Sequence, residues 1–289
     1  MNLRGYFITD ACASPDRRYL LTANLLSDSL TLVDTASGQV VGLYDLHAER
    51  QARLLPFNLV NAASLQSGPV CPGEIVSLFG LRFGPEEPVG ARVGTGGRLE
   101  TRFGEVRVLF NGVPAPLLYA GGNQINAVVP FGTGSHERCR VWVETPDGLT
   151  NAIEVAVAPT APALFTLDGS GGGQAAVQNA DGSLSGPDHP ARRGSVVTLW
   201  GTGPGETVPP GVDGAIAGSP ARLPIQRITV DVGGQPAEVL YAGDAPGMVS
   251  ALLQINVRIP ASAPTGASIP LGVSAGNARS PSGVTIAIA

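Results

Sequence analysis

Six polar side chains could act together, because they occur as two matching sets in the same order. They are Tyr119, Gln124 and Asn126 and, later in the chain, Tyr241, Gln254 and Asn256. In a β-strand the two amides of a Gln-Ile-Asn run share one face, while the isoleucine points to the other. Such a row could form a polar platform for a ligand beside the tyrosine, or could satisfy main-chain groups where strands cross. Their presence in both copies favours the structural role, because duplicated folds keep the residues that the fold requires.

Nucleophilic catalysis would need a serine, a histidine and an acid brought together by the fold. The nearest such set in the sequence is Ser195, His189 and Asp188. The run 186–190 around the histidine is typical of an exposed turn. The chain has no His-Glu-x-x-His motif and no lysine that could form a Schiff base. We therefore predict that the protein is not an enzyme.

Metal and phosphate chemistry have one weak candidate each. Asn179, Asp181 and Ser183 alternate like the first ligands of a calcium loop, but the glycine and glutamate that complete an EF-hand loop do not follow at their fixed spacing. The run Gly169–Gly173 is glycine-rich, yet no helix is expected after it whose N-terminus could hold an anion. We predict turns at both places, and no metal or cofactor.

The three cysteines are Cys12, Cys71 and Cys139, and none belongs to a Cys-x-x-Cys pair, which argues against a zinc site. Cys139 alternates with Val141 and Val143, so these three side chains share one strand face. Two states stay open for Cys71 and Cys139, a disulfide or buried free thiols. Free thiols are favoured, because cysteine commonly packs as a small hydrophobic residue.

The composition is that of a turn-rich β protein. Glycine (39) and proline (25) make up more than a fifth of the 289 residues, while hydrophobic residues reach 43% and charged residues only 14%. Disordered chains carry more charge and less apolar surface. All 18 basic residues are arginine and are scattered, which argues against a nucleic-acid partner. No run approaches the ~20 apolar residues of a membrane helix, so we expect no membrane insertion.

The first residues lack the charged region and the following apolar region of a secretory signal. We expect one of two situations: the protein stays inside the cell, or this chain is the downstream part of a longer exported protein.

An internal repeat is the strongest signal in the sequence. Four blocks recur in the same order: 72–80 and 193–201, 106–115 and 228–237, the Leu-Tyr-Ala runs 118–120 and 240–242, and the Gln-Ile-Asn runs 124–126 and 254–256. Chance does not keep four blocks in order. The pattern indicates a duplication.

The repeated blocks predict strands and turns. Their alternating apolar residues place one side of each strand toward a core. The pairs Asn111-Gly112 and Gly233-Gly234 supply the positive φ angles of a tight hairpin turn. Phe79 and Trp200 end the first strand of each copy, and we expect them to anchor the core. The second copy carries a longer loop, 243–250, before its Gln-Ile-Asn run.

The predicted fold class is all-β, with two tandem immunoglobulin-like sandwiches of roughly 100 residues each. Residues 61–158 are assigned to the first sandwich, and residues 159–289 to the second, which begins with an extra hairpin. Residues 49–60 are expected to be a linker. Residues 1–48 look like a partial blade of a YVTN-type β-propeller, and a lone blade cannot bury its own faces. It would need upstream blades, another chain, or docking onto the first sandwich.

From about residue 58 to residue 289, the sequence resembles the Solibacter uncharacterised C-terminal domain family. Besides the repeated blocks, the resemblance rests on four runs: 61–64, 179–184, 190–195 and 201–205. It implies a position at the end of a large exported bacterial protein, often behind a propeller, in an envelope or extracellular setting. The family brings no catalytic residues and leaves the activity open.

These observations predict a non-catalytic extracellular or cell-surface module that spaces or presents other domains. The expected partners are upstream propeller blades or other domains of a longer polypeptide. Two alternatives remain: a module that binds carbohydrate or another envelope polymer through exposed aromatic residues, and an accessory region of a larger secreted enzyme. The sequence names no ligand.

Overall fold

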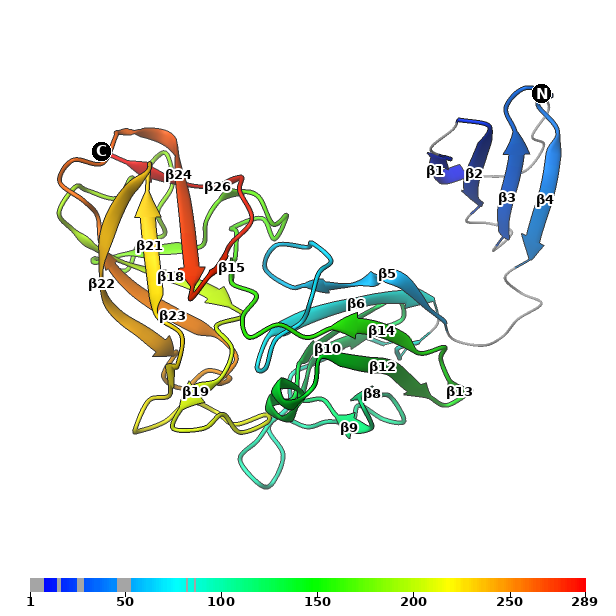
Figure 1. The fold of residues 1–289 in the computed structure, drawn as a ribbon, viewed down its shortest axis with the longest axis horizontal. Helices are drawn as coiled ribbons and strands as arrows, with labels where there is room; N and C mark the ends of the chain where they lie inside the picture. Colours follow the sequence, from blue (N-terminus) through cyan, green and yellow to red (C-terminus); the bar gives the residue numbers. More distant parts are fainter. Residues whose placement is uncertain (1–7, 15–16, 25–28, 46–52, 82, 86) are drawn as a thin grey trace. The chain divides into compact units, whose positions relative to one another are not determined.

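A computed structural model of the chain describes residues 8–14, 17–24, 29–45, 53–81, 83–85 and 87–289. These residues form strands and turns, and the one helix among them is the short 3-10 helix η1, Phe131–Ser135. The fold class is therefore all-β, as predicted. The chain divides into two compact units, residues 1–51 and residues 52–289, and each unit is described by itself (Figure 1).

The first unit is a four-stranded antiparallel sheet whose strands are neighbours in chain order. The strands are β1 (Ile8–Ala13), β2 (Tyr19–Asn24), β3 (Ser29–Asp34) and β4 (Val40–Asp45). Between β3 and β4, the Asp34 carboxylate accepts hydrogen bonds from the amides of Ala36 and Ser37, at 2.9 Å each. The bond from Ser37 is the main cause that lowers the pKa of Asp34. His47 lies outside the described residues.

The first repeat contains two sheets. One has the order β5-β6-β11-β10-β7, and these strands are β5 (Arg53–Asn61), β6 (Ile75–Leu81), β7 (Val89–Gly90), β10 (Leu117–Gly121) and β11 (Gln124–Val128). The other has the order β13-β12-β8-β9, with β14 also paired to β12. Its strands are β8 (Arg107–Phe110), β9 (Val113–Pro114), β12 (Arg138–Thr145), β13 (Gly148–Leu149) and β14 (Ile153–Ala156).

Strand β5 corrects one boundary. Residues 53–60 were expected to be a linker, but they form most of β5, while residues 49–52 lie outside the described part of the chain. Leu59 and Val60 pair with Leu78 and Ser77 of β6 and are buried. Burial of these two apolar residues against the sheet explains why the segment is a strand.

The second repeat is one continuous hydrogen-bonded sheet of ten strands, with a separate two-stranded ribbon. The main strands are β15 (Ala163–Leu164), β16 (Gly173–Gln174), β17 (Val177–Asn179), β18 (Val196–Thr202), β21 (Ile228–Val232), β22 (Gln235–Asp244), β23 (Leu253–Arg258), β24 (Gly266–Ala275), β25 (Ala278–Arg279) and β26 (Val284–Ile288). The ribbon is β19 (Thr207–Val208) with β20 (Leu223–Pro224). The expected extra hairpin is part of the sheet, since β15 and β17 pair with β18, and β16 pairs with β26.

The register of strand pairing repeats between the two halves. Asn126 lies between Ser77 and Tyr119, and Asn256 lies between Thr198 and Tyr241. The pairing of β10 with β11 changes register at a β-bulge between Leu117 and Tyr119. The pairing of β22 with β23 changes register at the equivalent place, between Val239 and Tyr241. The same strands with the same bulge support the duplication that the sequence indicates.

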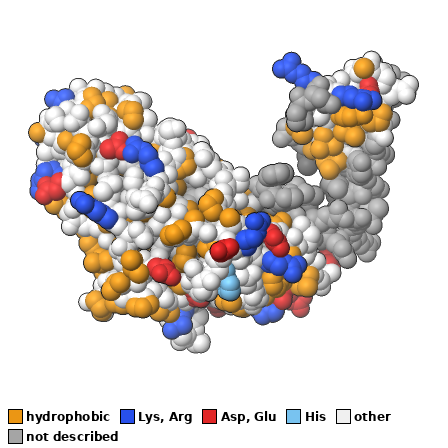
Figure 2. Space-filling model, in the orientation of Figure 1, with side chains coloured by type: hydrophobic (Ala, Val, Ile, Leu, Met, Phe, Trp, Pro, Cys, Tyr) orange, Lys and Arg blue, Asp and Glu red, His pale blue; other side chains and the backbone are white. Residues whose placement is uncertain are grey.

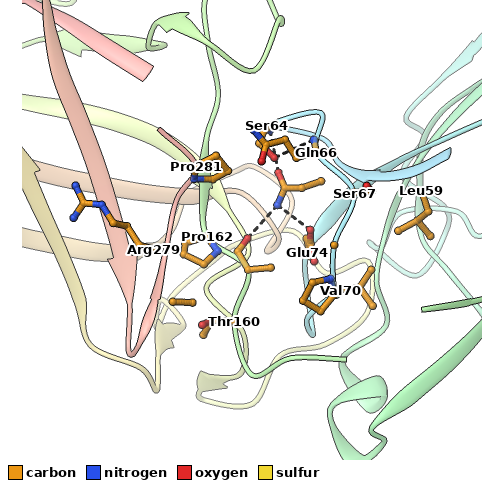
Figure 3. Close-up of a pocket in the computed structure, with 15 residues that line it drawn as sticks. Leu59, Ser64, Gln66, Ser67, Val70, Glu74, Thr160, Pro162, Arg279 and Pro281 are labelled. Atoms are coloured by element: carbon orange, nitrogen blue, oxygen red, sulfur yellow. Dashed lines mark hydrogen bonds between the residues drawn. The ribbon is translucent and has the colours of Figure 1, made fainter. Parts of the chain in front are cut away.

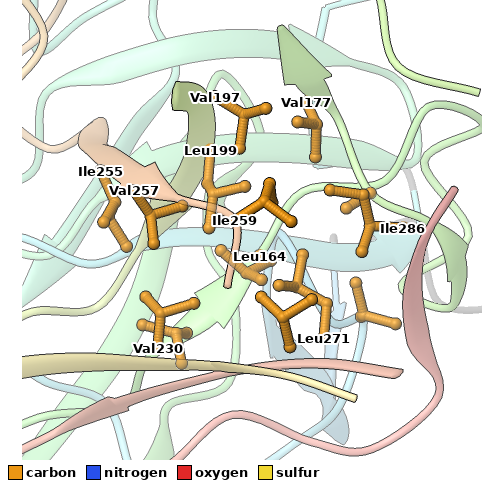
Figure 4. Close-up of a cluster of buried hydrophobic side chains, with 14 of the residues drawn as sticks. Leu164, Val177, Val197, Leu199, Val230, Ile255, Val257, Ile259, Leu271 and Ile286 are labelled. Carbon is orange, nitrogen blue, oxygen red and sulfur yellow. The ribbon is translucent and has the colours of Figure 1, made fainter. Parts of the chain in front are cut away.

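Each repeat has its own hydrophobic core, which lies between strands that pack face to face. In the second repeat, Figure 4 shows Val197, Leu199, Ile255 and Val257 facing residues such as Leu271 across the core. Matched positions fill the core of the first repeat: Val76, Leu78, Ile125, Ala127 and Val141. The alternating apolar pattern of the sequence therefore predicts these core faces correctly.

Phe79 and Trp200 do not anchor the cores, so that prediction is wrong. Both side chains are half-buried and belong to neither core cluster. The residue before each of them, Leu78 or Leu199, is fully buried. Because successive side chains in a strand point to opposite faces, the aromatic rings lie on the outer face of the sheet.

The predicted hairpin turns are confirmed. Asn111 and Gly112 have φ angles of 49° and 86°, and Gly233 and Gly234 have 59° and 79°. The cysteine prediction is also confirmed for the favoured state. All three cysteines are free thiols, and Cys71 and Cys139 are buried.

Candidate functional site

The predicted polar row exists in the first repeat. Gln124 and Asn126 point away from the core on β11, and the Gln124 amide donates to Asn126 Oδ1 at 2.9 Å. Tyr119 on β10 is the cross-strand neighbour of Asn126. All three side chains are half-buried. The structure brings these residues together.

The second repeat has the same row with additional contacts. The Gln254 amide donates to Asn256 Oδ1 at 3.0 Å, and the Thr198 hydroxyl donates to the same oxygen at 3.1 Å. The Tyr241 hydroxyl donates to the main-chain oxygen of Asp244 at 2.6 Å. These side chains bond to one another and to the main chain, as a structural role requires.

Replacing either asparagine with alanine should lower stability. The change Asn126→Ala leaves the half-buried Gln124 amide without its acceptor, and Asn256→Ala does the same to Gln254 and Thr198. We expect a loss of about 1 kcal/mol for each, and more for Asn256→Ala, in the free energy of unfolding measured in urea. Unchanged stability together with loss of a bound ligand would instead favour the platform.

The serine, histidine and acid that the sequence places closest together lie around one pocket of about 460 Å³ in the second repeat, here called the second-repeat pocket. Asp188, His189 and Ser195 all line it. The Ser195 hydroxyl donates to the main-chain oxygen of Arg192 at 2.7 Å, so it is used in a local turn. The structure thus brings the three residues to one pocket, while the serine bonds to the main chain.

The run Gly272–Gly276 matches the Gly-x-Ser-x-Gly pattern of hydrolase nucleophiles. Ser274 lies inside strand β24, opposite Thr229 of β21 and Arg279 of β25. A nucleophile elbow is a sharp turn between a strand and a helix. Ser274 is therefore a regularly paired residue within a strand and does not stand at such a turn.

The weak candidates for calcium and phosphate binding are both turns, as the sequence predicts. Asp181 accepts from the amide of Ser183 at 3.0 Å and from its hydroxyl at 2.7 Å, and these bonds lower the pKa of Asp181. Gly171, in the glycine-rich run, has φ +77°, and a Cβ there would lie 2.2 Å from the Ser64 oxygen. In the part of the chain that the structure describes, no three His, Cys, Asp or Glu side chains gather as metal ligands.

A buried carboxyl between the two repeats is the main feature that the sequence reasoning missed. Glu74 is only 1% exposed. Its Oε1 accepts from Asn61 Nδ2 and its Oε2 accepts from the Cys71 amide, both at 2.8 Å. Asn61 Nδ2 also donates to the oxygen of Ala161, at 3.1 Å (Figure 3). One amide thus joins the buried carboxyl to the segment that connects the repeats.

The carboxyl lies beside a pocket of about 220 Å³, here called the first-repeat pocket. Figure 3 shows residues of the first repeat, including Ser64 and Glu74, on one side, and Thr160, Pro162 and Arg279 on the other. Burial raises the pKa of Glu74 from 4.5 to about 8, because desolvation of the charge outweighs the hydrogen bonds from Cys71 and Asn61. The site therefore favours a neutral carboxyl at neutral pH.

Burial also raises the pKa of the two buried thiols, Cys71 and Cys139. It raises the pKa of Cys71 well above its ordinary value, and the charge of the neighbouring Glu74 acts in the same direction. It raises the pKa of Cys139 to about 11. Because the thiolate is the reactive form of cysteine, both thiols are poor nucleophiles.

The connecting segment, residues 159–162, is held from the other side by the second repeat. The Ala161 amide donates to the Gly203 oxygen at 2.9 Å, and the Thr160 hydroxyl donates to the Ala275 oxygen at 2.9 Å. A Cβ on Gly203 would lie 1.9 Å from the Ala161 oxygen. The two main chains are in contact, and only glycine allows that approach.

The long loop of the second repeat forms a further part of this junction. Ala251 is buried with Ile75 and Val128 of the first repeat, and Val249 packs against them. The Thr202 hydroxyl accepts from the Ile75 amide at 2.8 Å and donates to the Ala251 oxygen at 3.1 Å. The longer loop that distinguishes the second copy from the first therefore contacts the first copy.

A buried ion pair fixes this loop. Asp244, 4% exposed, accepts from the Ser250 hydroxyl at 3.1 Å and from Arg222 Nη1 at 3.4 Å. Arg222 Nε donates to the Pro210 oxygen at 3.2 Å. Pro210 and Asp213 belong to a second loop, which lies between β19 and β20. In this loop, Asp213 accepts a hydrogen bond from the Phe131 amide of the first repeat at 2.8 Å. The ion pair thus links two loops that both reach the first repeat.

One sequence signal points to the buried carboxyl. Glu74 stands within a repeated apolar block, at the position that Ser195 occupies in the second copy. An acid inside a core-forming strand pattern needs a partner, because unpaired buried charge is costly. The partner Asn61, however, lies in another strand and cannot be found from the pattern.

Among the described residues, no helix has both the length and the apolar character needed to cross a membrane. No protein-family model matches the chain, and a comparison with curated proteins finds no match.

Proposed function

We propose that the chain is a non-catalytic extracellular or cell-surface module that holds its two β repeats at a fixed spacing and so presents neighbouring domains. One observation carries the proposal, the two-sided hold on the connecting segment. Asn61 of the first repeat and Gly203 of the second bond to the same residue, Ala161. A flexible tether would leave these main-chain groups to water.

We further infer that each repeat is an immunoglobulin-like sandwich, and that the first unit is a β-propeller blade. The two sheets around one core in the first repeat support the former. The four-stranded meander β1–β4 supports the latter, because propeller blades are four-stranded sheets. The same features agree with the resemblance to the Solibacter C-terminal domain family, whose setting is extracellular.

The spacing can be tested by electron-electron distance measurement between spin labels. In a Cys12→Ser background, labels at the exposed positions Leu149→Cys and Leu184→Cys report on the two repeats, while the buried native thiols stay unlabelled. We expect one narrow distance distribution. The added change Ala251→Glu places a charge in the apolar junction and should broaden the distribution.

The matched control is Ala267→Glu, at an exposed position of β24 that does not belong to the apolar cluster around Ala251. It should leave the distribution narrow. A broad distribution in the protein without either glutamate would refute a fixed spacing.

A second function is favoured by the outer faces of the repeats. On β18 and β23, the half-buried Trp200 lies opposite Gln254, next to Thr198 and Asn256. Aromatic rings beside amides are suited to carbohydrate. On the side of the molecule in Figure 2, positive and negative side chains are interspersed. Retention on insoluble polysaccharide that is lost in Trp200→Leu would favour this function over the first.

A further inference from the structure

The first repeat closes one edge of its sheet with its own main chain. This edge belongs to β10, and the short strand β7 pairs with it in the antiparallel sense. Two further main-chain hydrogen bonds cover the same strand: the Phe83 amide donates to the Gly122 oxygen at 3.2 Å, and the Leu117 amide donates to the Glu100 oxygen at 2.9 Å. An extended segment of the first repeat therefore occupies the edge of β10.

The second repeat leaves the equivalent edge open. Its strand β22 corresponds to β10 through the repeated blocks. On one side β22 pairs with β23 from Glu238 onward, and on the other side its pairing with β21 stops at Ala237. At the far end of β22, the Asp244 amide donates to the Arg222 oxygen at 2.9 Å. Among the described residues, no strand pairs with the second side of residues 238–242, here called the free edge.

Three core positions along this edge differ in burial between the repeats. In the first repeat they are fully buried: Ala115, Leu117 and Ala120. In the second repeat they pack against the core but are only half-buried: Ala237, Val239 and Ala242. A strand edge with unpaired main-chain groups is a template for another strand, and here it also exposes apolar side chains of the core.

The long connection that precedes each hairpin explains the difference. In the first repeat this connection contributes two buried aromatic side chains to the core, Phe83 and Phe103. In the second repeat the connection, residues 203–227, contains no aromatic residue and contributes no member of the core cluster. It turns to the first repeat instead, where the Gly214 oxygen accepts from the Leu99 amide at 2.8 Å. The second core therefore lacks the aromatic cover that the first core has.

We propose that the free edge of β22 binds an extended strand of a partner polypeptide, which pairs antiparallel with residues 238–242 and places an aromatic side chain over Val239 and Ala242. This strand takes the position that β7 and Phe83 hold in the first repeat. In such strand addition, main-chain hydrogen bonds supply affinity and side-chain contacts supply selectivity. Leu240, at the centre of the free edge, is 46% exposed, so the site is accessible.

The inference deepens the role as a presenting module, because it names the chemistry of a partner. It rests on that role only for the source of the strand. Binding to β22 is measured directly, so it can hold or fail independently of the spacing between the repeats.

The test uses the complete chain, labelled with ¹⁵N, and an acetylated and amidated peptide with the sequence of residues 83–91, which contains Phe83 and β7. The peptide is titrated to about 5 mM, where a site of about 1 mM affinity is mostly filled. We expect saturable shifts of the amide signals of Val239, Tyr241 and Ala242, and none along β10, whose edge is closed. Absence of saturable shifts on β22 would overturn the proposal.

Two altered peptides separate strand pairing from apolar contact. N-methylation of both Val89 and Gly90 removes at least one amide that faces β22, because the N–H groups of successive strand residues point to opposite sides. Binding should weaken by about fivefold or more. The change Phe83→Ala in the peptide should weaken binding by about tenfold. If the N-methylated peptide bound as well as the parent peptide, strand addition would be refuted.

Two variants of the chain locate the binding. Val239→Glu and Ala242→Glu each place a charge where the partner strand would bury it, so each should abolish binding. The matched control is Thr229→Glu, at an exposed position of β21, which should bind like the native chain. Native affinity in either edge variant, with a folded spectrum, would show that the peptide binds elsewhere. The altered peptides test the native chain even if both edge variants fail to fold.

A second copy of the chain is the competing occupant of the free edge. Without peptide, the signals of β22 should not change as the protein is diluted. Changes confined to β22 on dilution, together with a dimer in sedimentation, would assign the free edge to self-association and overturn the partner strand.

Discussion

Replacing Gly203 with alanine is expected to lower the free energy of unfolding by about 3–4 kcal/mol, from overpacking together with a left-handed backbone angle. Gly203 has φ +79°, and the new Cβ would lie 1.9 Å from the Ala161 oxygen and 2.5 Å from its carbonyl carbon. Main-chain atoms cannot swing away as the end of a side chain can. The connecting segment would have to leave the second repeat and lose the bond from the Ala161 amide to the Gly203 oxygen.

Urea unfolding followed by tryptophan fluorescence and circular dichroism measures this loss. The control is Gly218→Ala, an exposed glycine whose added Cβ would meet nothing within 4 Å. It should stay within about 0.5 kcal/mol of the native chain. If Gly203→Ala were equally harmless, the close contact between the connecting segment and Gly203 would not exist in solution.

The second large effect is a fall in stability as the pH rises from about 4.5 to about 8. The pKa of Glu74 is about 8 in the folded protein, against 4.5 as the ordinary value. In this window the unfolded chain has released the proton of Glu74 while the folded chain still holds it. The folded state binds more protons, so stability decreases with pH and becomes level above 8, with a total change of a few kcal/mol.

The variant Glu74→Gln isolates this effect, because glutamine does not ionise. At pH 5 it should be less stable than the native chain, since an amide nitrogen cannot accept the hydrogen bond from Cys71 or Asn61 that a carboxyl oxygen accepts. Its stability should then change much less between pH 5 and pH 8.5. Asp244, whose pKa burial also raises, is present in both proteins and cancels in the comparison.

Urea midpoints at pH 5 and pH 8.5 give the slopes. Glu105→Gln changes an exposed glutamate and should keep the native slope. Equal pH slopes for Glu74→Gln and the native chain would mean that Glu74 is ionised in the folded protein throughout this range.

The regular parts of the fold could be predicted because they depend on neighbours in the sequence. Alternation places Val76 and Leu78, or Val197 and Leu199, on a core face, and Asn111-Gly112 needs positive φ angles in any hairpin of this length. The same alternation, counted from the buried leucines, places Phe79 on the outer face. The expectation that Phe79 and Trp200 lie in the core rested on the size of their side chains alone. It did not take into account that successive strand residues point to opposite faces.

The candidate site could be predicted only in part. The Gln-Ile-Asn rows were found because both members lie on one strand. The Glu74 site was not found, because its partners come from β5 and from the connecting segment: Asn61 and Ala161 are 100 residues apart. No local pattern carries information about a contact at that separation.

The sequence by itself determined the duplication, the core faces and the hairpin turns, because each depends on repetition or on periods of a few residues. The tertiary structure alone decided that the longer loop of the second copy contacts the first copy, and that Gly203 accommodates the connecting segment. It alone also showed that Asn61 joins the buried carboxyl of Glu74 to the connecting segment. The physical reason is that hydrogen-bond partners and close main-chain contacts are set by where the chain returns in space, and two copies of one strand pattern can return to different surroundings.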